Sequence, residues 1–456
     1  MQFTFRTAIL SLIAILVVAS PSFGQEAIIR PLPSLRDQAG EQQAWTAYRV
    51  NHILPGLMEK YGVDLWVLSM REYAEDPVFW SIAAPTTFAA RRRSIYLFHR
   101  REDGSVRNIA LGGGSQGGVF EAYKDPNQDV AGRELWADAQ WQLFRTFLEE
   151  ADPTSIALNI DPVHAFADGL HSGEREALEA ALGPEYLERV VRVPELAIDF
   201  IAIRAPEMEE RYRNIEETVH AIIGEAFSSA VITPGETTTD EVRWWLREKV
   251  QESGMTTWFM PSVGVQRHSV GPKAKDASGP QGDTVIERGD LLWCDFGVIA
   301  MRLKTDTQHL GYVLREGESS PPEGLLNGLR TSNRLQDILL TEMEPGRTGN
   351  EILLAALDQM RSEGIDGTIY THPIGDHGHG AGPLIGLWDR QEALPGRGNV
   401  RLSPNTWYSI ELQATVEVPE WNNQRVSFRQ EEEARVKGDG TRSWVYKRQT
   451  ELHIVR

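Results

Sequence analysis

A carboxylate inside an apolar segment is the feature that most restricts how this chain can fold. Asp295 interrupts the run Leu292-Trp293-Cys294-Asp295-Phe296-Gly297, which predicts a buried strand. A buried charge without a partner is costly, so Asp295 needs a compensating group. Asp306 begins the next predicted strand eleven residues later, and a hairpin turning near Ala300-Met301 would place the two carboxylates opposite each other. A pair of aspartates at this spacing, taken alone, is more often one salt-bridged residue and one surface residue. If the two carboxylates do face each other, they repel, and cations must lie between them.

Three further segments carry side chains that can ligate metals. Three of the 11 histidines lie in a glycine-rich turn, Thr371-His372-Pro373-Ile374-Gly375-Asp376-His377-Gly378-His379-Gly380. Glu411 lies between apolar Ile410 and Leu412, as in a strand with one inward-facing ligand. Glu431 follows in Arg429-Gln430-Glu431. Any one of the 65 acidic residues could be an ordinary surface group, but the combined set predicts a metal site.

The order and intervals of these residues resemble the M24 (pita-bread) metallopeptidase family, which includes aminopeptidase P and prolidase. The resemblance covers roughly residues 206–456. It implies a pita-bread catalytic domain that binds two divalent metal ions and hydrolyses peptide bonds in Xaa-Pro peptides. The implied metal ligands are Asp295, Asp306, His372, Glu411 and Glu431.

The family spacing also distinguishes the histidines. His372 has Gly375 three residues later and His379 seven residues later, as the ligand histidine and second histidine of the family do. The resemblance implies that His379 stabilises the intermediate or assists the leaving amine. The family's other site histidine lies upstream of the first aspartate, and here the candidate is His268. It precedes Asp295 by 27 residues, a longer gap than usual, so we expect a loop residue rather than a catalytic one.

The choice among the later carboxylates rests on the same pattern. Glu431 is preferred to Glu432 because it follows Arg429 by two residues, and Glu432 should then face the opposite side of the strand. The resemblance implies that Glu411 also transfers protons to or from the metal-activated water. Cys294 adjoins the first aspartate ligand, so its thiol should face away from the site and into the core.

Charge supports two divalent ions independently of the resemblance. Four carboxylates contribute −4, two divalent cations contribute +4 and histidine is neutral, so the bare site is neutral. Oxygen-rich ligation with one imidazole suits manganese, iron, cobalt or zinc, and the resemblance favours manganese. The family often has an arginine three residues after the second aspartate, whereas this chain has Asp306-Thr307-Gln308-His309. We expect substrate or partner contacts to differ there.

The beginning of the chain predicts export. Arg6 is followed by an apolar run from Ala8 to Val18 and by the small-residue end Ser22-Phe23-Gly24, as in a secretory signal peptide. We expect cleavage after residue 24 and a periplasmic or secreted protein, with a retained anchor as the alternative. Cys294 is the one cysteine, so no intrachain disulfide can form and core burial must supply the stability.

The remaining patterns predict two domains. Apolar runs at residues 63–68, 94–98 and 156–160 predict strands of an α/β N-terminal domain over residues 25–205, which loosely resembles the family's creatinase-like domain. An α+β catalytic domain, residues 206–456, should open with two helices, the second beginning at a capping box of Thr238 and Glu241. From Asp290 onward we expect strands, the clearest at residues 291–298, 307–314, 407–413 and 426–436.

Two other function classes stay open at this point. Gly113-Gly114-Ser115-Gln116-Gly117 matches the serine-hydrolase elbow, which needs a strand-to-helix turn and partner residues, and glycine abundance makes a chance match easy. A binding protein that keeps the fold would not need all five ligands. The formal net charge of −19 argues against nucleic acid as a partner. We expect a peptide substrate and no membrane contact after cleavage. The sequence does not fix the oligomeric state, and a homodimer is one option.

Overall fold

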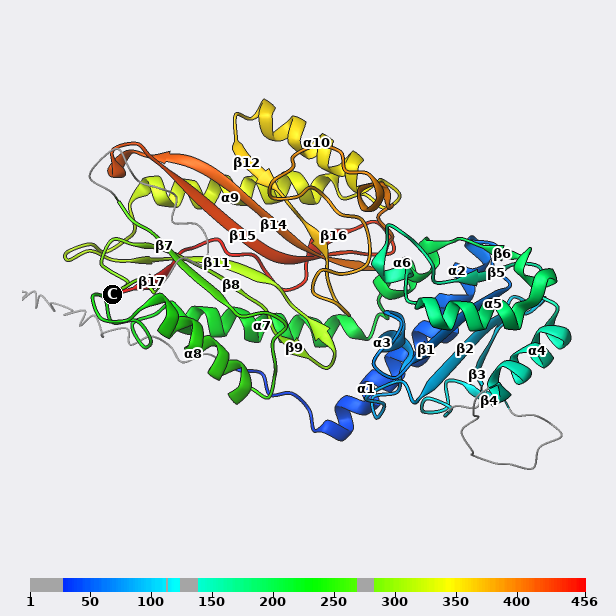
Figure 1. Cartoon of the computed structure of the whole chain (residues 1–456). Coiled ribbons are helices and arrows are strands. Elements are labelled where there is room, and N and C mark those ends of the chain that lie inside the picture. The colour runs from blue at the N-terminus through cyan, green and yellow to red at the C-terminus, as the bar shows by residue number, and fades with distance from the viewer. Residues whose placement is uncertain (1–27, 112–113, 124–137, 269–282) are drawn as a thin grey trace, which may run out of the picture.

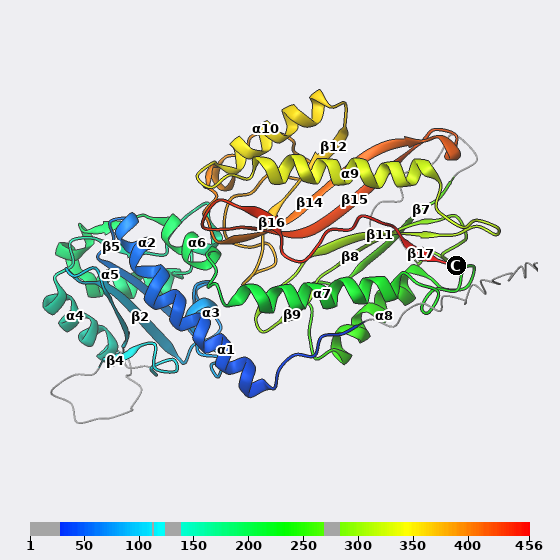
Figure 2. The same cartoon turned by 180° about the vertical axis from the view of Figure 1, so that it is seen from behind.

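The computed structural model describes residues 28–111, 114–123, 138–268 and 283–456. It has two lobes, each built around one sheet (Figures 1 and 2). The predicted leader, residues 1–24, lies outside the described residues, so cleavage and export stay predictions. Among the described residues, no helix has the length and apolar character needed to cross a bilayer.

The first lobe is an α/β layer around a six-stranded mixed sheet, in the order β4-β3-β2-β1-β5-β6. Its central strand β1 is almost entirely buried, as expected for a strand with helices on both faces. The three strands predicted for this lobe are β1, β2 and β5. The strands are β1 (Leu65–Arg71), β2 (Arg93–Arg100), β3 (Val106–Leu111), β4 (Glu121–Tyr123), β5 (Ile156–Leu158) and β6 (Val190–Val191). The helices are α1 (Leu35–Tyr48), α2 (Leu54–Lys60), α3 (Phe79–Ile82), α4 (Ala139–Ala151), α5 (Ser172–Leu187) and α6 (Pro194–Ala202).

The second lobe is built on a nine-stranded sheet with the main order β12-β14-β15-β11-β8-β7. Strands β13, β16 and β17 pair with β14, β15 and β11, and the short strands β9 and β10 pair with each other at the tip of the β8–β11 hairpin. The strands are β7 (Ser262–Gln266), β8 (Leu291–Phe296), β9 (Ile299–Ala300), β10 (Leu303–Lys304), β11 (Thr307–Val313), β12 (Asp366–Ile369), β13 (His372–Pro373), β14 (Thr406–Val418), β15 (Gln424–Val436), β16 (Arg442–Trp444) and β17 (His453–Val455). The helices are α7 (Met208–Ala226), α8 (Thr239–Glu252), α9 (Glu323–Glu342) and α10 (Gly349–Ser362).

Two helix pairs cover this sheet. Helices α7 and α8 pack against β8 and β7, α9 packs against β14, and α10 packs against α9 and β12 (Figure 1). The capping box predicted at Thr238 and Glu241 is present and begins α8. The expectation of strands from Asp290 onward was incomplete, because it missed α9 and α10. A second capping box, Thr348 with Glu351, begins α10 and was a readable signal of it.

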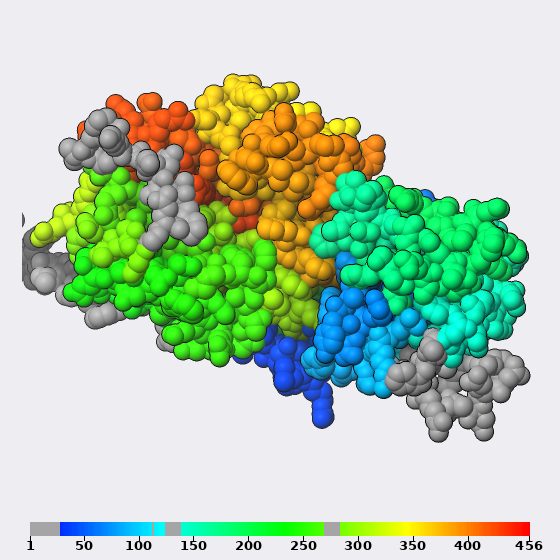
Figure 3. Space-filling view, viewed as in Figure 1, coloured from blue at the N-terminus to red at the C-terminus, as the bar shows by residue number. Residues whose placement is uncertain are grey.

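The two lobes pack directly against each other (Figure 3). Helix α6 is the last helix of the first lobe and α7 is the first of the second, so the predicted boundary near residue 205 falls between them. The exact domain limits stay a prediction.

The packing of α9 on the sheet leaves no room at Gly328. A Cβ added there would overlap the buried ring of Phe428 on β15. We predict that Gly328→Ala lowers the free energy of unfolding by about 1–3 kcal/mol, the usual cost of overpacking a core. Gly224→Ala in α7 is the control, since its new Cβ would lie at an ordinary 3.6 Å from His453 Cε1. Urea unfolding of both variants checks this, and an equal effect in the two would contradict it.

Candidate metal centre

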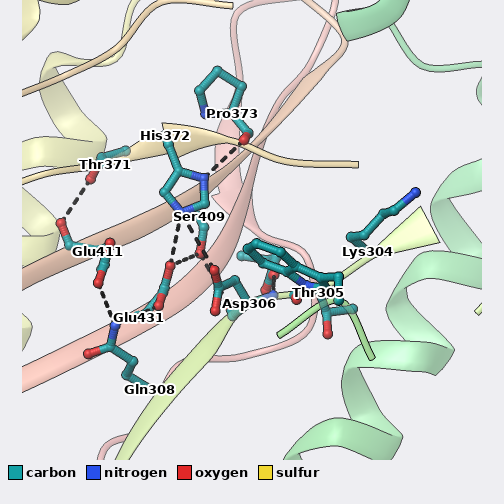
Figure 4. Close-up of polar contacts among 12 residues, drawn as sticks. Lys304, Thr305, Asp306, Gln308, Thr371, His372, Pro373, Ser409, Glu411 and Glu431 are labelled. Carbon is teal, nitrogen blue, oxygen red and sulfur yellow. Dashed lines mark hydrogen bonds and ion pairs between the residues drawn. The ribbon is translucent and has the colours of Figure 1, made fainter. Parts of the chain in front are cut away.

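The register of four neighbouring strands places three of the predicted ligands in one row. Asp295 on β8 pairs with Gln308 on β11, Gln308 pairs with Glu431 on β15, and Glu431 pairs with Glu411 on β14. Paired residues point to the same face of a sheet, so these side chains converge on one side. Asp306 lies two residues before Gln308 on the chain, so its side chain points to the same face as these residues (Figure 4).

The predicted hairpin register was wrong by two residues. The ladder partner of Asp295 is Gln308 rather than Asp306, which approaches along the diagonal. The cause is the position of the turn: it lies at Met301 and Arg302, where φ is 51° and 68°, one residue later than expected, and the β9–β10 pairing continues the register of β8 with β11. The two aspartates still meet, because Asp295, Asp306 and Glu431 bring ligand oxygens within 4.8 Å of one another.

His372 is oriented as a metal ligand would be. Its Nδ1 lies 3.0 Å from the carbonyl oxygen of Pro373 and must donate there, so Nε2 carries the lone pair. Nε2 lies 3.2 Å from Glu431 Oε1 and 3.7 Å from Asp306 Oδ2 (Figure 4). Within the described residues, His372 Nε2, Asp295 Oδ1 and Asp306 Oδ1 are buried without a hydrogen-bond partner. Orphaned polar atoms on three neighbouring side chains of one cluster fit bound cations.

Burial makes the charges of this cluster unstable without cations. Burial, with the neighbouring Glu431 as the second cause, raises the pKa of Asp295 to about 8. The same two causes raise the pKa of Asp306 and of Glu411 well above the ordinary range. Divalent cations would offset this repulsion and hold the carboxylates ionised.

Gln308 is a functional residue that the sequence analysis missed. Its Nε2 donates to Glu411 Oε1 at 2.5 Å and to Glu431 Oε2 at 2.8 Å. Trp293 Nε1 donates to Gln308 Oε1 at 2.9 Å, which fixes the orientation of the amide. The expectation that substrate or partner contacts differ at residues 306–309 stays a prediction. In the structure, Gln308 orients two proposed ligands.

The glycine-rich turn separates its histidines. The ring of His379 is exposed and meets the ring of His372 edge-on, with 4.7 Å between centroids. A nitrogen of His379 also falls within 4.8 Å of ligand atoms of Asp306 and His372, so His379 borders the centre. His377 faces the first lobe instead, where its ring lies 4.8 Å from that of Phe166.

Asp376 ties this turn to the first lobe. Its carboxylate accepts hydrogen bonds from Arg49 Nη1 at 2.7 Å, Ser81 Oγ at 2.6 Å and Arg204 Nη1 at 2.6 Å. The two arginines hold the pKa of Asp376 well below its usual range despite its burial. Lys304 Nζ donates to the backbone oxygen of Asp376 at 2.6 Å. The segment between His372 and His379 is therefore held by both lobes.

The other candidates lie away from these ligands. Among the described residues, His268 belongs to no candidate cation group; its Nε2 accepts from Asn422 Nδ2 at 3.1 Å and its ring stacks on Trp421. Ser115 lies in a turn that leads from β3 into strand β4 rather than into a helix, and its Oγ accepts from the Gly118 backbone at 3.2 Å. The strand-to-helix elbow is therefore not formed there. Cys294 is fully buried in the core beside α7, as predicted.

Comparison with known proteins identifies the family of this chain. The profile of metallopeptidase family M24 matches residues 210–438, which contain all five predicted ligands. The chain belongs to metallopeptidase family M24. Members of this family are peptide-bond hydrolases that use divalent metals, and the second lobe is their pita-bread fold. A search of curated protein sequences found no match.

Solved structures share this fold at low sequence identity. An X-Pro aminopeptidase from Thermotoga maritima MSB8 is 16% identical with a TM-score of 0.59, over 87% of this chain and 99% of its own. An Xaa-Pro dipeptidase from Bacillus anthracis is 16% identical with a TM-score of 0.57, over 92% and 99%. The N-terminal domain of FACT complex subunit SPT16 from Cicer arietinum (chickpea) is 11% identical with a TM-score of 0.50, over 92% and 99%. These likenesses show the fold, and the site must supply the evidence for function.

The five proposed ligands, Asp295, Asp306, His372, Glu411 and Glu431, form a site that we call the M24 centre. We predict that metal binding to the metal-free M24 centre releases at least about one proton per chain at pH 7. The raised pKa values keep carboxyl groups protonated there, and metal ligation requires their ionised form. Metal affinity should therefore rise with pH through neutrality, as Asp295, whose pKa is about 8, and the carboxyl groups of Asp306 and Glu411 lose their protons. A pH-indicator dye in weak buffer measures the release. Metal binding without acidification would contradict this.

We predict that Asp376→Asn lowers kcat about 10- to 100-fold while metal content stays unchanged, because the turn that carries His379 loses its anchor. The matched control is Glu41→Gln, which weakens another ion pair between the lobes, Arg211 with Glu41 at 2.8 Å. Elemental analysis, circular dichroism and steady-state kinetics on one substrate are needed for both variants. Equal losses of kcat in the two would mean that the contact stabilises only the lobe interface.

Proposed function

We propose that this chain is a dinuclear metal-dependent peptidase that hydrolyses Xaa-Pro peptides, with manganese as the preferred metal. The observation that carries the proposal is the convergence of five side chains, with orphaned polar atoms, on one face of the sheet. The proposed ligands are Asp295, Asp306, His372, Glu411 and Glu431. A binding protein that kept the fold would have no use for this costly cluster.

The residues around the ligands fit peptide hydrolysis. Two divalent ions supply a water of lowered pKa and polarise the scissile carbonyl when they are bound. Glu411 accepts a proton from the attacking water and passes it toward the leaving amine. Its carboxylate is positioned for this by Gln308, 2.5 Å away. His379, exposed at the edge of the centre, donates a hydrogen bond to the oxygen that gains charge in the transition state.

Specificity for Xaa-Pro peptides is supported by the fold likeness to the X-Pro aminopeptidase and the Xaa-Pro dipeptidase. The test is hydrolysis of Ala-Pro and Ala-Pro-Ala, with Ala-Ala and Ala-Ala-Ala as matched peptides without proline, in the presence of manganese. We expect release of the first alanine from the proline peptides at a clearly higher kcat/KM. Equal kcat/KM for the two sets of peptides would reject the proline specificity but would still support a peptidase. No hydrolysis of either set by metal-loaded protein would reject the enzyme.

Two histidine variants separate the ligand from the catalyst. His379→Ala should lower kcat by about two to four orders of magnitude, roughly 3–5 kcal/mol of barrier, and leave metal content nearly unchanged. His372→Ala should lose at least one ion, because it removes a direct ligand. Metal stoichiometry and turnover on one substrate check both variants. Loss of an ion in His379→Ala with full occupancy in His372→Ala would reverse the two roles.

Ser115→Ala is the control for the serine-hydrolase alternative. The residue lies in a turn of the first lobe, so its removal should change neither turnover nor metal content. Loss of turnover with full metal occupancy would revive that alternative.

A further inference from the structure

A second group of metal-ligating side chains lies on the opposite face of β15 from the M24 centre. Glu432 follows Glu431 on this strand, so its side chain points the other way, toward α7. There it meets His220 of α7 and His309 of β11, and one ligand atom from each residue lies within 4.8 Å of the others. We call these three residues the His–Glu cluster.

The two imidazoles face different oxygens of the same carboxylate. His220 Nε2 lies 3.0 Å from Glu432 Oε2, and His309 Nε2 lies 3.0 Å from Glu432 Oε1. The two rings are nearly perpendicular, with centroids 4.5 Å apart. The exposed fractions are 7% for His220, 2% for His309 and 0% for Glu432. Three ligand atoms, one from each residue, thus converge among buried side chains.

The cluster has a carboxylate without a permanent cation. Within the described residues, the only ion-pair partners of Glu432 are the two histidines, and neither is charged unless it is protonated. Burial lowers the pKa of His220, which favours a neutral imidazole with a free lone pair. Among the described residues, the one polar contact of Glu432 Oε2 is His220 Nε2, 3.0 Å away. A buried charge of this kind is costly unless a cation offsets it.

Neighbouring groups orient the cluster as supporting groups orient metal ligands. His309 Nδ1 lies 3.0 Å from His453 Nε2, so an Nδ1–H that donates to His453 leaves the His309 Nε2 lone pair facing Glu432. The backbone N–H of Gln449 donates to Glu432 Oε1 at 2.6 Å and fixes the carboxylate.

We propose that the His–Glu cluster binds one divalent transition-metal ion, with zinc the best match, as a structural site separate from the M24 centre. Two imidazoles and a carboxylate are a ligand set that zinc accepts, and the second carboxylate oxygen could complete four-coordination. The burial of all three residues, which keeps substrates away, favours a structural role. The ion would join α7 to β11 and β15, directly behind the strand that carries Glu431. The inference does not depend on the proposed peptidase function.

The test counts zinc in a protein whose catalytic centre is disabled. Asp306→Asn/Glu411→Gln/Glu431→Gln keeps the shapes of these side chains while removing three charges. After incubation with zinc and gel filtration, we expect about one zinc per chain by elemental analysis. Adding His220→Gln and His309→Gln should reduce it to near zero. Since the parent variant is already catalytically inactive by design, failure of the peptidase proposal would not change this count.

Two further measurements keep the result decisive if the five-fold variant does not fold. Cobalt added to the three-fold variant should give the visible absorption bands of a tetrahedral site with nitrogen and oxygen ligands. His164→Gln in the three-fold variant is the matched control, because His164 pairs with Asp161 at 2.8 Å without a second imidazole. It should leave the zinc count unchanged. A folded three-fold variant that retains no zinc after gel filtration and shows no cobalt absorption bands would overturn the proposal. The cluster would then be only a hydrogen-bonded network.

Discussion

Carboxylates buried side by side in one sheet can all stay ionised only if positive charge lies among them. Asp295, Asp306, Glu411 and Glu431 meet this condition poorly with protein groups alone, since their shared repulsion and burial raise the pKa of Asp295, Asp306 and Glu411. The sheet of the second lobe holds these four carboxylates close together in spite of their repulsion. Metal ions convert the repulsion into ligation.

Strand alternation does most of the positioning. Asp295, Gln308, Glu431 and Glu411 are ladder partners across β8, β11, β15 and β14, so their side chains point to one face of the sheet. The neighbouring residues on the same strands go to the other face, where Cys294 enters the core and Glu432 meets two histidines. The same two-residue period therefore builds both the M24 centre and the His–Glu cluster behind it.

Much of this site was predictable from local pattern, and the failures have physical causes. The spacing of Asp295, Asp306 and His372 located segments that do converge, and the orientation of Glu432 away from Glu431 was confirmed. The hairpin register was wrong because the turn lies at Met301-Arg302, one residue later than expected, where both residues adopt a left-handed conformation that no periodicity reveals. Gln308 and Asp376 were missed because their roles depend on partners far along the chain, including Arg49 of the first lobe.

The central claim is that five side chains hold two divalent ions on one face of the sheet. Anomalous diffraction from crystals grown with manganese tests it most directly, because it locates each ion separately from any other bound metal. Two peaks about 3.5–4 Å apart, surrounded by Asp295, Asp306, His372, Glu411 and Glu431, are the predicted result. A single peak, or none, with the carboxylates hydrogen-bonded to one another through retained protons, would contradict the account.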